Sequence, residues 1–138
     1  LKNIACEKPG STNNTIIISA HYDSRMEDIN NSTARAPGAN DNASGVSALL
    51  EVARILSDVS LNHSIIFVLF SGEEQGKWGS TYYADYIDKT DVDLDLLINL
   101  DMVGFSSFVQ DRRPCDCNSA ITLVAMADNK SKEVGSID

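Results

Sequence analysis

Three short apolar runs constrain the fold of this chain more than any other feature. Residues 15–20 contain three consecutive isoleucines, residues 65–70 (IIFVLF) are apolar throughout, and residues 94–100 form a third segment of strand length. Unbroken β-branched and apolar runs of this length are typical of strands that are covered on both faces of a sheet. We therefore expect a sheet with three buried strands at its centre.

Between these runs the hydrophobic period becomes that of a helix. Apolar residues recur at intervals of three and four over residues 44–56, and residues 80–87 suggest a shorter helix. We expect its tyrosines at 82, 83 and 86, together with Trp78, to be packing residues. The order strand, helix, strand, helix, strand predicts an α/β fold with a mostly parallel mixed sheet and helices on both faces.

Two further strands are expected at the flanks of the sheet. Residues 1–6 are predicted to pair antiparallel with residues 15–20 across a turn-rich stretch, and residues 121–127 have the composition of another strand. The chain has 138 residues, of which 43% are hydrophobic, which suits one domain with its own core.

The charge balance excludes several classes of function. Twenty acidic residues against eleven Lys and Arg give a formal net charge of -9, and the basic residues form no cluster. This argues against a nucleic-acid partner, and no apolar run approaches the roughly 20 residues of a membrane-spanning helix. A cationic partner fits better, and metal ions are the obvious small ones.

Cysteines and glycosylation triplets bear on the compartment. The three cysteines are Cys6, Cys115 and Cys117; the last two are too close to bridge each other, so Cys6 could pair with one of them. Asn-X-Ser/Thr triplets begin at Asn13, Asn30, Asn31, Asn42, Asn62 and Asn129. They favour a secreted, periplasmic or other extracytoplasmic protein.

Metal-binding side chains follow the carboxyl ends of the buried strands or precede the first helix: His21, Asp23, Asp41, Glu73, Glu74 and Asp101. Ligands of open α/β sheets bind at the carboxyl ends of the strands, so we expect these residues to converge on one edge. Five carboxylates cannot all stay ionised in one cleft unless cations lie among them. One His with several carboxylates suits zinc, with manganese or cobalt as substitutes.

Four segments of the chain carry a family resemblance: His21-Tyr22-Asp23, residues 38–45 (GANDNASG), residues 70–74 (FSGEE) and residues 99–104 (NLDMVG). In this order they resemble the motifs of the co-catalytic dizinc aminopeptidase family, which also contains glutaminyl cyclases. The resemblance implies a zinc-exopeptidase fold and two zinc ions. It extends from residue 16 to residue 104.

The resemblance also implies a role for each residue of these motifs. His21 and Asp101 would hold one zinc ion, Asp41 would bridge both ions, and Glu74 would bind the second. Glu73 would be the general base of the reaction. Asp23 would accept a hydrogen bond from the other ring nitrogen of His21 and so fix its tautomer.

One ligand of the family pattern has no counterpart here. The pattern requires a further His for the second zinc ion, downstream of Asp101, whereas this chain has only His21 and His63. His63 precedes the strand at residues 65–70, which places it at the opposite edge of a parallel sheet. We therefore expect residues 1–138 to be one catalytic domain that is incomplete on its C-terminal side, with impaired second-metal binding and little activity alone.

The function expected from these residues is that of a zinc-dependent aminopeptidase. Such an enzyme hydrolyses the first peptide bond of peptide or protein N-termini with metal-activated water. Two alternatives stay open: a glutaminyl cyclase, which uses one zinc ion and cyclises N-terminal Gln, and a non-catalytic relative that has lost a ligand. The retained Glu73 argues against the non-catalytic alternative, because a general base has no purpose without chemistry.

Overall fold

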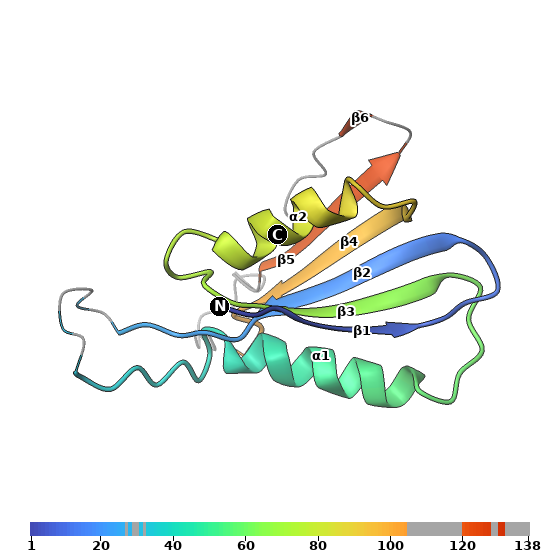
Figure 1. Ribbon diagram of the computed structural model, residues 1–138. Helices are drawn as coiled ribbons and strands as arrows, with labels where there is room; N and C mark the ends of the chain where they lie inside the picture. Colours follow the sequence, from blue (N-terminus) through green and yellow to red (C-terminus); the bar gives the residue numbers. More distant parts are fainter. Residues whose placement is uncertain (27, 29–30, 32, 105–119, 128–129, 132–138) are drawn as a thin grey trace, which may run out of the picture.

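A computed structural model describes residues 1–26, 28, 31, 33–104, 120–127 and 130–131, with side chains described up to residue 104. Its centre is a six-stranded sheet in the order β1-β3-β2-β4-β5-β6 (Figure 1). The strands are β1 (Ile4–Lys8), β2 (Asn14–His21), β3 (Ser64–Phe70), β4 (Asp93–Asp101), β5 (Ala120–Ala127) and β6 (Lys130–Ser131).

Parallel pairing is confined to the three central strands. β2 lies between β3 and β4 and runs parallel to both, whereas β1 and β5 pair antiparallel with β3 and β4. The predicted mixed α/β sheet is confirmed, including the strand expected at residues 121–127. His21 is paired with Phe70 and Ser19 with Asn99, so the three carboxyl ends lie at one edge of the sheet.

The predicted pairing of the first two strands is wrong. β1 pairs with β3, which lies between β1 and β2 in the sheet. The connection from β1 to β2 crosses the amino end of β3, where Gly10 N donates to Ser64 Oγ (3.0 Å) and Thr12 N donates to Asn62 O (2.9 Å). The turn residues indicate that the chain reverses its direction, but they do not determine whether the two strands become neighbours.

Two helices cover opposite faces of the sheet (Figure 1). Helix α1 (Ala43–Leu56) packs through the buried Leu49 against Ile18 and Phe67. Helix α2 (Trp78–Ile87) packs on the other face, against a cluster that contains Ile17 and Val68. Since successive residues of one strand supply opposite faces, an unbroken apolar strand serves both helices.

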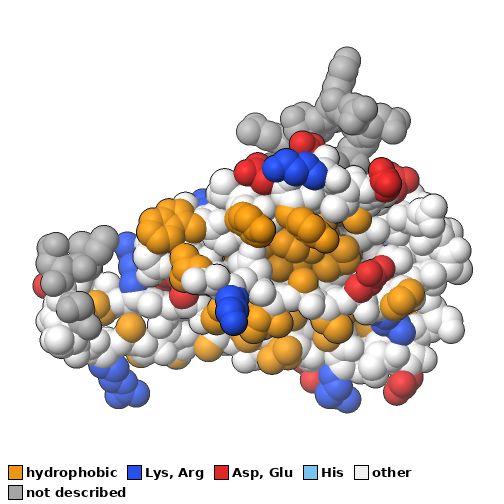
Figure 2. All heavy atoms as spheres, in the orientation of Figure 1, with side chains coloured by type: hydrophobic (Ala, Val, Ile, Leu, Met, Phe, Trp, Pro, Cys, Tyr) orange, Lys and Arg blue, Asp and Glu red, His pale blue; other side chains and the backbone are white. Residues whose placement is uncertain are grey.

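The packing expectation for the aromatic residues of α2 holds only for Tyr83. Its ring lies edge-on to Phe70 with centroids 5.7 Å apart, while Trp78, Tyr82 and Tyr86 are 58%, 71% and 53% exposed. A helix that rests on a sheet buries one stripe of its surface. The side of α2 that points away from the sheet is therefore exposed, and hydrophobic side chains gather on this surface of the molecule (Figure 2).

His63 lies at the amino edge of the sheet, as expected. Its Nε2 is 3.0 Å from Asp95 Oδ2, which also accepts from Asn14 Nδ2 at 2.9 Å. Asn42 is buried, so its triplet is no glycan acceptor in the fold, whereas Asn13 and Asn62 are exposed.

Two further expectations concern the membrane and the cysteines. Among the described residues, no helix is long and apolar enough to cross a membrane. Cys6 is exposed on β1, and the cysteines at 115 and 117 lie outside the described residues.

Candidate metal centre

Three side chains from distant parts of the sequence meet at the carboxyl edge of the sheet. His21 is the last residue of β2, Asp101 is the last residue of β4, and Asp41 precedes the cap of α1. One ligand atom from each lies within 4.8 Å of the others. His21 Nε2 is 2.9 Å from Asp41 Oδ1 and 3.6 Å from Asp101 Oδ1, so both carboxylates face the same ring nitrogen.

Asn42 holds two of these ligands in place. Its side chain is 2% exposed; Oδ1 accepts from Gly45 N (3.0 Å) and Met102 N (3.2 Å), and Nδ2 donates to Leu100 O (2.9 Å). The first bond caps α1, and the other two attach the cap to the end of β4. Since Asp41 and Asp101 are the neighbours of these bonded residues, the amide fixes the spacing of the two carboxylates.

Gly45 lets the helix start approach β4 closely. A Cβ atom at this position would lie 2.4 Å from Leu100 O, a backbone atom that cannot move aside. The glycine at the end of the motif at residues 38–45 is therefore required by the contact between α1 and β4.

Asp23 contacts the His21 ring through its backbone oxygen. The ring Nδ1 lies 3.1 Å from the backbone oxygen of Asp23 and 3.6 Å from its carboxylate. A proton on Nδ1 bonded to this oxygen leaves Nε2 free to face Asp41 and Asp101. The Asp23 carboxylate instead accepts from the backbone N–H groups of Glu73 (3.1 Å) and Glu74 (3.2 Å), which ties the end of β2 to the turn after β3.

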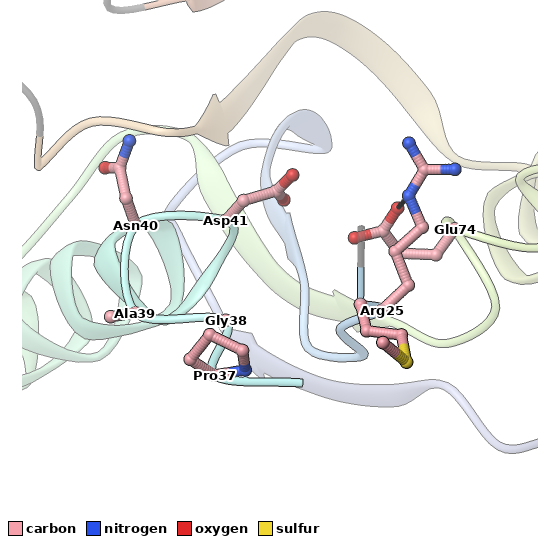
Figure 3. Close-up of a pocket in the computed structure, with 8 residues that line it drawn as sticks. Arg25, Pro37, Gly38, Ala39, Asn40, Asp41 and Glu74 are labelled. Carbon is pink, nitrogen blue, oxygen red and sulfur yellow. Dashed lines mark ion pairs between the residues drawn. The ribbon is translucent and has the colours of Figure 1, made fainter. Parts of the chain in front are cut away.

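Glu74 lies across an open pocket of about 380 Å³ from the three grouped side chains. The Asp41 and Glu74 carboxylates point toward each other from opposite sides of this pocket (Figure 3). Burial raises the pKa of Glu74, and the negative charge of Asp41 adds to the rise. Glu73 contributes to the same rise through its charge, so its side chain lies close enough to influence the site.

Arg25 is a participant that the sequence analysis missed. Its Nε lies 2.9 Å from Glu74 Oε2, and its positive charge opposes the rise in the pKa of that carboxyl. A single arginine in a polar loop has no spacing pattern that predicts a partner about fifty residues away. Its position directly after the His21-Tyr22-Asp23-Ser24 segment is the only signal in the sequence.

Comparison with known proteins decides the family. Residues 3–132 match the description Peptidase family M28. This chain belongs to peptidase family M28. The resemblance stated from the four motifs is therefore confirmed, because the matched segment contains all of them.

The names of three proteins that are similar to this chain indicate their functions. A probable zinc metalloprotease of Pyrenophora teres f. teres is 38% identical over 109 residues, which are 78% of this chain and 23% of that protein. The structure of a zinc aminopeptidase from Bacillus subtilis matches with a TM-score of 0.60 and 35% identity, over 74% of this chain and 24% of that one. A Bacteroides thetaiotaomicron glutaminyl cyclase matches with a TM-score of 0.63 and 29% identity, over 74% and 41%.

The residues of this M28 chain fit the zinc that its family implies. Oδ1 of Asp101 is a buried oxygen without a hydrogen-bond partner in the part of the chain that the structure describes. An unpaired buried carboxylate oxygen is unfavourable unless a cation or a donor satisfies it. An imidazole nitrogen and two carboxylate oxygens facing one point are ligands that zinc accepts.

Proposed function

We propose that this chain carries the zinc-binding part of an aminopeptidase site, which hydrolyses the first peptide bond of peptides and proteins. The observation that carries the proposal is the convergence of His21, Asp41 and Asp101 around the unpaired Asp101 Oδ1. The chain spans 23% of the length of the fungal relative, so the activity is proposed for the protein that contains this segment.

In this proposal His21 and Asp101 would hold the first zinc ion, and Asp41 would be shared with a second ion on the Glu74 side. When bound, zinc would supply Lewis acidity that activates water and polarises the scissile carbonyl at neutral pH. The second ion would have Asp41 and Glu74 as its ligands among the described residues, because His63 lies at the other edge of the sheet.

The protein side chains supply the remaining steps. Glu73 takes a proton from the attacking water and passes it to the leaving amine, which needs a carboxylate beside the site and outside the ligand set. Asp23 contributes by fixing the Glu73–Glu74 backbone and the His21 ring.

The decisive assay uses the full-length protein with saturating zinc and two substrates. Aminoacyl arylamides report release of an N-terminal residue, and a Gln-initiated peptide reports either release of Gln or formation of pyroglutamate. Release from the arylamide supports the aminopeptidase proposal, while pyroglutamate alone supports the cyclase. Failure with both substrates, with zinc shown to be bound, supports a non-catalytic relative.

We also propose that the protein acts outside the cytoplasm. The asparagines Asn13 and Asn62 of two glycosylation triplets are exposed, which supports this location. Fractionation of the source cells tests it, and recovery of the full-length protein from the cytosol alone would contradict it.

A further inference from the structure

We propose that Arg25 is a built-in counter-cation for Glu74, so that a second metal ion binds between Asp41 and Glu74 only by displacing the Arg25 guanidinium. The inference rests on the proposed zinc site and goes beyond it, since it concerns how this chain makes the two metal positions unequal.

The first argument is the geometry of the ion pair. Arg25 Nε lies 2.9 Å from Glu74 Oε2, and the side chain of Glu74 is only 7% exposed. A carboxylate removed from water to this extent requires a cation or several donors. Figure 3 shows the Arg25 guanidinium beside the Glu74 carboxylate, across the pocket from Asp41.

The backbone presents Arg25 at this point. Asp23 accepts from the Glu74 N–H, and Ser24 Oγ donates to Ala36 O at 3.3 Å. Gly38, at a φ of +55°, lies against Ser24, where a Cβ would come within 2.6 Å of the Ser24 Cβ. Arg25 directly follows Asp23 and Ser24 and lines the pocket. The contacts that hold the loop therefore also place Arg25 beside Glu74.

The two halves of the site differ in what already satisfies their carboxylates. Asp101 Oδ1 accepts no hydrogen bond among the described residues and lies 3.6 Å from His21 Nε2, so an ion can use this oxygen without breaking a hydrogen bond to it. Glu74 is already paired with a cation, so an ion there must displace the Arg25 side chain from this ion pair. Arg25 is 57% exposed, and its guanidinium can therefore move into water without rearranging the core.

The test is a metal titration of the full chain, freed of metal by chelation and then measured with Zn²⁺ by calorimetry and with Co²⁺ by absorption spectroscopy. In the wild type we expect two unequal binding steps. Arg25→Ala should tighten the second step by about tenfold, because the ion no longer has to displace a cation from Glu74, and leave the first within about twofold. Arg25→Gln, which keeps most of the side chain, should act in the same direction, and Arg25→Lys should lie between.

Arg54→Ala is the matched control. Arg54 forms an ion pair with Glu51 on the exposed side of α1, at 2.7 Å, and its removal changes the net charge by the same amount. The second step should be unchanged in this variant. Circular dichroism and thermal unfolding verify that every variant is folded.

The inference would be overturned by equal affinities of both ions in the wild type, by one bound ion in both wild type and Arg25→Ala, by a weaker second step without Arg25, or by the same shift in Arg54→Ala. Absence of any metal binding would overturn the proposed zinc site and this inference together. A normal first step with an unchanged second step would overturn the inference alone.

Discussion

The residues of the site differ in how exposed their side chains are and in which contacts hold them. The His21 ring is 3% exposed and is held through Nδ1, whereas Asp41 is 45% exposed and contacts the ring at Nε2. Removal of a ligand should therefore affect metal binding more than folding where the ligand is exposed. The variants at positions 41 and 73 test the assigned roles.

Asp41→Ala should abolish tight metal binding at both positions, because Asp41 is the one carboxylate that faces both His21 and Glu74. The free energy of unfolding of the metal-free protein should change by less than about 1 kcal/mol, since the side chain is half exposed. Metal analysis after equilibrium dialysis, with urea unfolding, measures both effects. Retention of two ions per chain would refute the bridging role.

Glu73→Gln should leave metal binding intact and lower kcat of the full-length protein by roughly 10²–10⁴-fold, because only the proton transfer is lost. Steady-state kinetics with an aminoacyl arylamide and metal analysis of the same samples measure the two quantities. Glu51→Gln, on the exposed face of α1, is the control and should leave both unchanged. If metal is lost instead, Glu73 is a ligand and the two glutamates have been exchanged.

At the scale of elements, the site depends on how α1 meets β4 and how α2 rests on the sheet. Asn42 is the only described side chain seen to link the start of α1 to both residues that flank Asp101. On the other face, Tyr83 links α2 to β3 through its ring contact with Phe70. Each contact can be tested against a neighbouring residue that lacks it.

Asn42→Ala should lower the free energy of unfolding by roughly 2–4 kcal/mol, since it removes a helix cap and leaves the carbonyl of Leu100 and the N–H of Met102 without this partner. Metal affinity should fall as well, because Asp41 and Asp101 lose their shared anchor. Asn40→Ala, which removes one exposed bond to Gly104, should lose less than about 1 kcal/mol. Equal losses of stability in the two variants, measured by urea unfolding, would contradict the role of Asn42 as the shared anchor of Asp41 and Asp101.

Tyr83→Phe should change how stability depends on alkaline pH. Burial raises the pKa of Tyr83, with a smaller contribution from Tyr86. The unfolded chain therefore loses this proton first, so the tyrosine's contribution is complete below its ordinary pKa of about 10 and is lost as the pH rises through the folded value. Urea unfolding between about pH 9 and about pH 11 should show a smaller decline in the variant.

The exposed neighbour Tyr82 provides the control for this measurement. Tyr82→Phe should follow the wild-type decline over the same pH range. If Tyr83→Phe also showed the wild-type decline, burial of Tyr83 would have no effect on the stability of the protein at alkaline pH.

At the scale of the whole molecule, the parallel register of β2, β3 and β4 brings the candidate metal-binding side chains of distant segments to one edge of the sheet. A net charge of -9 adds to the attraction for cations there. Because the ligands come from β2, β4 and the start of α1, a bound ion joins three elements. Binding should therefore stabilise the fold as a unit.

Zinc at about 100 times its dissociation constant should raise the free energy of unfolding by about 2.7 kcal/mol for one site, and chelation should reverse the effect. Thermal unfolding with and without zinc measures it. Asp101→Asn, which keeps the size of the side chain, should lose most of the gain. An equal gain in Asp101→Asn would show that zinc stabilises the chain from another place.

The residues and the elements of this protein were predictable to different degrees. Hydrophobic periods gave the helix at residues 44–56 within one residue and the strands of the core. The partner of β1 was mispredicted, because the turn at residues 8–14 reports a reversal and not the neighbour in the sheet. The aromatic side of α2 was mispredicted because residue type does not reveal which stripe of a short helix faces the sheet.

By itself, the sequence determined the order of strands and helices and the set of candidate metal-binding side chains, because periodicity and the residues that follow each strand are local properties. Only the tertiary structure decided that the carbonyl of Asp23, and not its carboxylate, is nearest to His21 Nδ1, and that Arg25 neutralises Glu74. These contacts join residues through the packing of a loop against a turn. Their distances depend on the whole fold, so no spacing along the chain encodes them.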